Sequence, residues 1–206
     1  MQFVNNATSI KILPYYLWPL QLDPPVVPDF AVGRFTDCSF TVNDNYSVGQ
    51  PFLEHIFLER VRGDISLGGV LSLRFDECVF DMEQKFPNLN NRGILSLGSK
   101  FEVVRSEFRN LVKGIEAIPN NAVNSNYKVI RTEFRDCAIG IHNVNNTGAK
   151  IVANTFWLGN THVKYDQIFE TPVVSNVTQQ VGVYFEGGTN GFELKNNRFW
   201  GGKWAT

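Results

Sequence analysis

Residues 127–142, YKVIRTEFRDCAIGIH, contain the local pattern that decides the fold. Apolar side chains stand at Tyr127 and Val129, a small polar side chain follows at Thr132, and Phe134 comes two residues later. Alternation of apolar and polar residues over a few positions is typical of a β-strand with one buried face. A Gly-Ile pair six residues beyond the phenylalanine opens another apolar stretch. The segment therefore predicts three short strands joined by tight turns.

The same pattern recurs around six phenylalanines, which we call the anchor phenylalanines: Phe40, Phe80, Phe108, Phe134, Phe156 and Phe199. Two residues before each anchor stands a side chain that can form hydrogen bonds: Cys38, Cys78, Ser106, Thr132, Asn154 and Asn197. The positions five and seven residues before the anchors are mostly apolar, with Gly33 and Ala149 as the weakest matches. Glycines that open the third strand recur in five places: Gly63, Gly93, Gly114, Gly140 and Gly182. Such self-similarity is the signature of a repeat architecture.

One short repeat cannot bury its apolar face alone, whereas stacked repeats can. We therefore predict an all-β chain in which residues 30–206 wind into a parallel β-helix. Stacking brings equivalent residues of successive coils about 4.8 Å apart, and we call such a set of residues a column. The anchors should form an internal aromatic column. The Cys, Ser, Thr and Asn residues before them should form an internal polar ladder.

The anchors are unevenly spaced, which predicts insertions between coils. Loop insertions are expected at three places: near 43–62, 83–92 and 159–181. All three follow an anchor, so they should project from one edge of the helix, where repeat proteins often place function. A hidden extra coil in the two longest anchor intervals is the alternative. Residues 1–29 fall outside the pattern and are expected to form a cap or a degenerate first coil.

Two segments carry a resemblance to known proteins: KIVANTF at residues 150–156 and FELKNNRF at residues 192–199. They resemble the repeats of right-handed parallel β-helix proteins of the pectate-lyase-like and of the carbohydrate-binding and sugar-hydrolase types. The Cys-x-Phe pieces at Cys38 and Cys78 resemble β-helix segments of large secreted surface proteins of Bacteroidetes, often exported by the type IX route with a C-terminal sorting domain. The resemblance implies a right-handed helix of about six to eight coils, in an extracellular or cell-surface protein, as one part of a longer polypeptide.

A leucine-rich repeat is the competing interpretation, because its consensus also places apolar residues and an Asn or Cys before a final apolar residue. That consensus needs a further leucine ten residues before the final position. The residues found there are Phe30, Val70, Gly98, Asn124, Asn146 and Thr189, which are mostly polar or glycine. A helical half with recurrent leucines is also missing. The sequence therefore favours the β-helix.

Composition excludes several classes of partner. The chain has 206 residues, 19% of them charged, and a formal net charge of -1, which gives no electrostatic reason to expect nucleic acid or an anionic membrane. The apolar run 10–22 is interrupted by Lys11, Pro14 and Pro19, so no membrane insertion is expected. The three widely spaced cysteines fit neither a disulfide framework nor a zinc site. We expect buried free thiols, no metal and no cofactor.

Outward positions of the anchor strands form the candidate binding surface. The residue after the anchor gives the column Arg109, Arg135, Trp157 and Trp200 in four consecutive repeats. The tryptophans are expected to form a stacking platform for a sugar, and the arginines to contact an acidic sugar. The alternative is an exterior aromatic ladder covered by a neighbouring segment.

A charge lattice is expected beside this column. Six residues are expected to share one outward strand face: Arg105, Glu107, Arg109, Arg131, Glu133 and Arg135. A solvated, salt-bridged sheet surface is the simpler interpretation of these charges.

Catalytic motifs are absent from the sequence. Glycoside hydrolysis needs two carboxylates at a defined separation, and the pair that could stack is Asp37 with Glu77. The histidines His55, His142 and His162 are scattered and are expected to be structural or superficial. We therefore expect a non-enzymatic segment, either a structural stalk or an adhesive module that binds a glycan or another cell-surface protein. The alternative is a polysaccharide-active lyase or glycoside hydrolase with catalytic residues in the loops or outside this segment.

Overall fold

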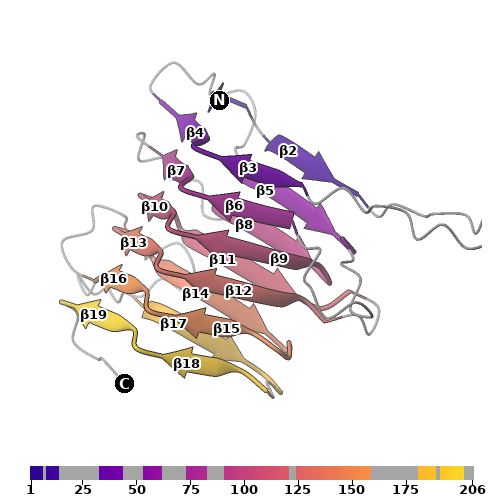
Figure 1. Ribbon diagram of the computed structural model, residues 1–206, viewed down its shortest axis with the longest axis vertical. Coiled ribbons are helices and arrows are strands. Elements are labelled where there is room, and N and C mark those ends of the chain that lie inside the picture. Colours follow the sequence, from indigo (N-terminus) through magenta and orange to yellow (C-terminus); the bar gives the residue numbers. More distant parts are fainter. Residues whose placement is uncertain are drawn as a thin grey trace, which may run out of the picture.

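The computed structural model describes residues 1–6, 8–13, 33–43, 53–61, 73–82, 91–120, 124–158, 181–188 and 191–201. These residues form three parallel sheets, here called A, B and C, that run side by side along the long axis of the molecule (Figure 1). Sheet A contains β1 (Gln2–Val4), β4 (Ser39–Val42), β7 (Val79–Met82), β10 (Glu107–Arg109), β13 (Glu133–Arg135), β16 (Thr155–Trp157) and β19 (Arg198–Trp200). Sheet B contains β2 (Thr8–Ile12), β5 (Glu54–Glu59), β8 (Arg92–Leu97), β11 (Lys113–Ile118), β14 (Ile139–Val144) and β17 (Val181–Glu186). Sheet C contains β3 (Arg34–Thr36), β6 (Leu73–Asp76), β9 (Lys100–Val104), β12 (Asn126–Ile130), β15 (Lys150–Val152) and β18 (Glu193–Lys195).

The chain visits the sheets in the fixed order A, B, C, and each strand pairs with the strand three places later. Six complete coils result, followed by β19 as an additional strand of sheet A. This arrangement confirms the predicted right-handed parallel β-helix. It also excludes the leucine-rich repeat, because each coil contributes three strands and the described residues contain no helix. Accordingly, no helix among them is long and apolar enough to cross a membrane.

The anchor phenylalanines form the aromatic column that the sequence predicts. Successive rings lie 4.6–5.0 Å apart between centroids, with planes within 10° of parallel. Phe3 extends the column into β1, 4.8 Å from Phe40. The rings between the two ends are fully buried. Offset aromatic stacks add to the burial of large apolar surfaces, so this column is a main source of the cohesion between coils.

Direct pairing between anchors shows that neither of the two long anchor intervals contains an extra coil. Phe40 pairs with Phe80 and Phe156 pairs with Phe199, so each interval holds a single coil and its connections. The range 43–62, expected as an insertion, contains β5 and so belongs partly to the coil itself. The ranges 83–92 and 159–181 lie almost entirely outside the described residues. By their position between strands, they join a strand of sheet A to the next strand of sheet B, as does the segment before β5.

The polar ladder is also present, at the turn from sheet C to sheet A. From Cys78 to Asn154, each ladder residue donates its backbone N–H to the side-chain oxygen of the ladder residue one coil later. The donor–acceptor distances are 3.1 Å from Cys78 to Ser106, 3.4 Å from Ser106 to Thr132, 2.9 Å from Thr132 to Asn154 and 2.9 Å from Asn154 to Asn197. Buried backbone N–H groups need such partners. The ladder supplies them and so stabilises the turn from sheet C to sheet A.

Replacing Asn154 by alanine tests the ladder. The change removes the acceptor of the Thr132 N–H and the donor that lies 2.9 Å from the Val129 carbonyl oxygen. We expect urea denaturation to show a loss of about 1–3 kcal/mol, because buried groups are left without partners. The exposed Asn126, one coil earlier, is the control and should change stability by less than about 0.5 kcal/mol as alanine. Equal losses at both positions would contradict this role of the ladder.

The residue before each ladder position adopts a left-handed backbone conformation. The φ angles lie between 49° and 57° at Asp37, Glu77, Arg105, Arg131, Ala153 and Asn196. This conformation turns the chain from sheet C into sheet A. The expectation that Arg105 and Arg131 share the outward strand face of Glu107 and Arg109 is therefore wrong, because both arginines stand on the turn.

Glycine occupies the position of β8, β11, β14 and β17 that faces the aromatic column. A Cβ atom on Gly114 would lie 2.8 Å from ring atoms of Phe134 and 2.6 Å from the carbonyl oxygen of Gly140. In β5 this position belongs to His55 and not, as the sequence pattern suggested, to Gly63, since Ile56 pairs with Ile94. The fully buried His55 ring lies 6.3 Å from Phe40 and 6.2 Å from Phe80 between centroids.

Burial explains the behaviour of several polar core groups. It lowers the pKa of His55 to about 3, which keeps the imidazole neutral in the core. The three cysteines are free and buried, as expected. Burial raises the pKa of Cys78 to about 11 and that of Cys137 to about 12, so these thiols act as small apolar groups.

The first coil begins near the N-terminus. β1 and β2 take the sheet A and sheet B positions, with Phe3 opposite Phe40 and Ile10 opposite Ile56. Most of the remainder of residues 1–29 lies outside the described residues.

Candidate functional site

The outward column of sheet A brings together the four predicted binding residues. Arg109 pairs with Arg135, Arg135 with Trp157, and Trp157 with Trp200, each on the next coil. Trp157 and Trp200 remain 38% and 53% exposed. We call this set of four residues the Arg–Trp ladder.

The tryptophans of this ladder do not form one flat platform. Their ring centroids are 5.8 Å apart with planes 15° from parallel, which is an offset stack. The Arg135 guanidinium carbon lies 4.9 Å from the Trp157 ring centroid. Trp157 is thus contacted by Arg135 and by Trp200. Trp200 follows at the end of the described sheet and is the more exposed ring.

Carboxylates neutralise the two arginines of the ladder. Arg135 Nε lies 3.0 Å from Glu107 Oε1, and its terminal nitrogen lies 2.5 Å from Glu133 Oε2. Arg109 also binds Glu107, and a terminal nitrogen lies 3.9 Å from Asp81 Oδ2. The network forms because the arginines stand beside the carboxylates of neighbouring outward positions in sheet A, so that opposite charges face one another. The guanidinium groups are therefore oriented but already paired.

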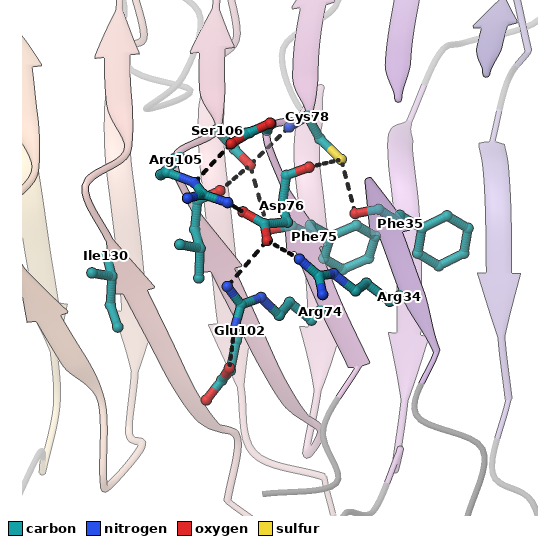
Figure 2. Close-up of polar contacts among 12 residues, drawn as sticks. Arg34, Phe35, Arg74, Phe75, Asp76, Cys78, Glu102, Arg105, Ser106 and Ile130 are labelled. Carbon is teal, nitrogen blue, oxygen red and sulfur yellow. Dashed lines mark hydrogen bonds and ion pairs between the residues drawn. The ribbon is translucent and has the colours of Figure 1, made fainter. Parts of the chain in front are cut away.

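A second polar cluster lies on sheet C, around Asp76. Figure 2 shows three arginines pointing at this carboxylate. The distances from terminal nitrogens to Asp76 oxygens are 2.5 Å for Arg34, 3.1 Å for Arg74 and 2.9 Å for Arg105. Burial of the carboxylate raises its pKa, but the hydrogen bonds from Arg34 and Arg105 and the charge of Arg74 outweigh this and hold the pKa of Asp76 below its usual value. The cluster connects three coils through one buried anion.

A third cluster lies on sheet B around Glu116. This nearly buried carboxylate binds Arg92 and Lys113, and His142 Nδ1 lies 3.0 Å from Glu116 Oε1. The other ring nitrogen of His142 lies 2.8 Å from Glu186 Oε2. Both ring nitrogens of His142 therefore lie within hydrogen-bonding distance of a carboxylate oxygen. Burial raises the pKa of Glu116, but the hydrogen bond to His142 and the charges of Arg92 and Lys113 outweigh it and hold the pKa well below its usual value.

The repeat in the sequence contains a signal for this third cluster. Glu116, His142 and Tyr184 each stand two residues after a glycine of the repeat, and the register places them in one column. The rings of His142 and Tyr184 stack with centroids 5.1 Å apart. His142 takes part in this cluster through its contacts with Glu116, Glu186 and Tyr184, while His162 lies outside the described residues.

The carboxylates of the enzyme alternative occupy turns. Asp37 and Glu77 stand at equivalent left-handed positions of adjacent coils. Glu77 Oε1 lies 3.0 Å from Arg105 Nε, so it is already engaged in an ion pair. Within the described ranges, no group of three or more His, Cys, Asp or Glu side chains is placed to hold a metal ion.

The fold and these clusters define a class of protein, a parallel β-helix whose coils are connected by ionic clusters on sheets B and C and which exposes an aromatic ladder on sheet A. No protein-family model, no curated protein and no solved structure matches the chain.

Proposed function

We propose that this chain is a rigid, non-enzymatic β-helix module of an extracellular protein that binds a glycan through the Arg–Trp ladder. The observation that carries the proposal is the exposure of Trp157 and Trp200 on adjacent coils. Large aromatic side chains are usually buried in part by their surroundings, and an exposed cluster of them often marks an interaction site.

The geometry favours an uncharged sugar over an acidic one. Glu107 and Glu133 already pair with Arg135, so an acidic ligand has to displace a carboxylate before it can bind that guanidinium. The exposed part of the Trp200 ring has no such competitor on its own strand, where Arg198 and Phe199 precede it. The apolar face of a sugar ring can pack on this indole, while Glu133 can accept hydrogen bonds from sugar hydroxyl groups. The proposed ligand class is therefore a neutral glycan.

The fold supplies a rigid support for this surface. Each residue of the ladder belongs to a strand that pairs with a neighbouring coil, and the anchors beside Arg109, Arg135 and Trp157 are buried. A site on paired strands loses little conformational entropy on binding, which favours weak multivalent contacts of the kind that adhesion uses. Export to the cell surface belongs to this proposal, and the resemblance of the repeats to secreted surface proteins supports it.

A glycan array tests the proposal. We expect the wild-type chain to bind a subset of neutral glycans, and the Trp157→Ala/Trp200→Ala variant to lose at least about tenfold in apparent affinity, because stacking on one aromatic ring is worth about 1 kcal/mol or more. Tyr184→Ala is the matched control, since it removes an exposed aromatic ring from sheet B. Absence of binding by the wild type, or equal binding by both variants, would overturn the proposal.

A further inference from the structure

We propose that Cys38 and Cys78 form a reversible disulfide bond that links two adjacent coils of the β-helix. All three cysteines are free in the structure, which is the reduced form of the protein. The wide spacing of the cysteines in the sequence gives no sign of a pair, but the fold places these two at equivalent positions of the polar ladder. The inference rests on the register of that ladder and does not depend on glycan binding.

Backbone pairing holds the two cysteines side by side. Ser39 pairs with Val79 in sheet A and Thr36 pairs with Asp76 in sheet C, so the register is kept on both sides of the cysteines. The Val79 N–H donates to the Cys38 carbonyl oxygen, with 2.9 Å between nitrogen and oxygen. Adjacent strands lie about 4.8 Å apart, and disulfides join residues whose Cα atoms are about 4.4–6.8 Å apart. The bond therefore needs no change of register.

The two thiols are neighbours inside the helix. The Cys38 sulfur lies 3.4 Å from the carbonyl oxygen of Thr36. The Cys78 sulfur lies 3.5 Å from the carbonyl oxygen of Phe35, on the preceding coil, and Figure 2 shows it directed at this oxygen. Burial raises the pKa of Cys78, and the adjacent Cys38 thiol adds to this rise. A disulfide removes only S–H groups, which are weak hydrogen-bond donors.

The expected bond is somewhat strained. Side chains of one column point the same way, so their Cβ atoms start about 4.8 Å apart, slightly beyond the range of about 3.5–4.5 Å that is usual in disulfides. Forming the bond has to draw two adjacent turns together, and strained disulfides are reduced more easily than relaxed ones. We therefore expect a bond that small thiols can reduce again.

A small-molecule disulfide such as oxidised glutathione is the oxidant. One cysteine thiolate attacks it and displaces a small thiolate, which leaves a mixed disulfide on the protein. The second cysteine thiolate then attacks the protein sulfur of that mixed disulfide and releases the other small thiolate. The two protons lost by the cysteines pass to the released thiolates. The two electrons taken from the protein thus reduce one small disulfide to two thiols.

Burial determines when this exchange takes place. Cys38 is 6% exposed and Cys78 is 0% exposed, and the pKa of Cys78 is raised to about 11. Thiolates and not thiols are the nucleophiles of the exchange, so the folded, reduced protein should react slowly. The first attack therefore takes place while the chain folds, and formation of the ladder then brings the second thiol to the mixed disulfide.

A redox titration tests the bond. The reduced wild-type chain, unfolded in urea, is diluted into native buffer with defined ratios of reduced and oxidised glutathione. The products are trapped by alkylation and identified by mass spectrometry. We expect a peptide that links Cys38 to Cys78, with an effective concentration of the two thiols at least about tenfold higher in native buffer than in urea. An equal or lower value in native buffer, or mixed disulfides alone, would overturn the proposal.

Serine substitutions identify the bonded pair. Cys38→Ser and Cys78→Ser should each abolish the intramolecular bond in native buffer, and Ser106 shows that serine fits this ladder. Cys137→Ser is the matched control and should leave the effective concentration unchanged, because the Cys137 sulfur is buried near the carbonyl oxygen of Phe108, at 3.5 Å. A native disulfide that includes Cys137 contradicts the pairing. If a serine variant does not fold, the titration of the wild type still decides.

The stability of the oxidised protein provides a second measurement. The midpoint of urea denaturation should be higher for the oxidised than for the reduced wild type, because the bond restricts the unfolded chain. The Cys38→Ser variant should unfold at one midpoint with and without reductant. A lower midpoint for the oxidised wild type would show that the fold opposes the bond and would overturn the proposal.

Discussion

Replacing Phe134 by alanine is expected to lower the free energy of unfolding by about 3–5 kcal/mol. Its ring is buried between Phe108 and Phe156, at centroid distances of 5.0 and 4.8 Å. The substitution removes both stacking contacts and leaves a cavity that the paired strands on either side cannot close. Denaturation by guanidinium chloride, followed by circular dichroism, measures the loss.

Phe199 is the matched control for this prediction. It belongs to the same column but is 37% exposed and stacks on one described ring, that of Phe156. We expect the Phe199→Ala variant to lose about half as much stability as Phe134→Ala, in line with the smaller area removed from the core. Equal losses would show that the central position of Phe134 contributes nothing of its own.

Replacing Glu116 by glutamine is expected to lower the free energy of unfolding by about 3 kcal/mol at neutral pH. The change leaves the charges of Arg92 and Lys113 without their shared, nearly buried carboxylate, and breaking one partner of a buried ion pair costs about 3–5 kcal/mol. Glu193→Gln, on an exposed ion pair with Lys150, should cost less than about 1 kcal/mol.

The Glu116 effect should depend on pH with a defined sign. The folded-state pKa of Glu116 is lowered from an ordinary value of 4.5. The ionised form therefore stabilises the fold above pH 4.5, and this contribution is lost as the pH falls below that value. The stability difference between wild type and Glu116→Gln should shrink as the pH falls from 5 to the acid limit of folding. A constant difference across that range would contradict the proposed charge interaction.

The repeat pattern predicted most of the fold because the residues of the aromatic column and of the polar ladder can be recognised from their type and their spacing in the sequence. Phe134 and Thr132 alternate with outward residues, and their equivalents recur at fixed offsets, so the inward face can be recognised without the structure. The pattern did not identify Phe3 as a member of the aromatic column, because it uses residues five and seven positions before the anchor. This sequence has only two residues before Phe3.

The position of β5 could not be predicted by the glycine pattern. His55 replaces the glycine that other coils use, and the nearby Gly63 offered a false match. The structure accommodates His55 because its ring lies near Phe40 and Phe80 within the core. A search for glycine alone misses a position at which a planar side chain can be packed.

The sequence predicted which four residues share the outward column of the candidate site, but not how their side chains are arranged. The register of Arg109, Arg135, Trp157 and Trp200 follows from the repeat. Whether two indoles lie flat or stack on each other depends on side-chain torsions, which the repeat does not specify. The ion pairs of Arg135 with Glu107 and Glu133 cross from one column to the next and likewise depend on side-chain reach.

The central claim is that the exposed indoles of sheet A bind a neutral glycan, and isothermal titration calorimetry with a glycan bound by the wild type tests it most directly. The account predicts that Trp200→Ala weakens binding at least about fivefold, while Tyr184→Ala and the wild type bind alike. Undiminished affinity in Trp200→Ala, or an equal loss in Tyr184→Ala, would contradict it.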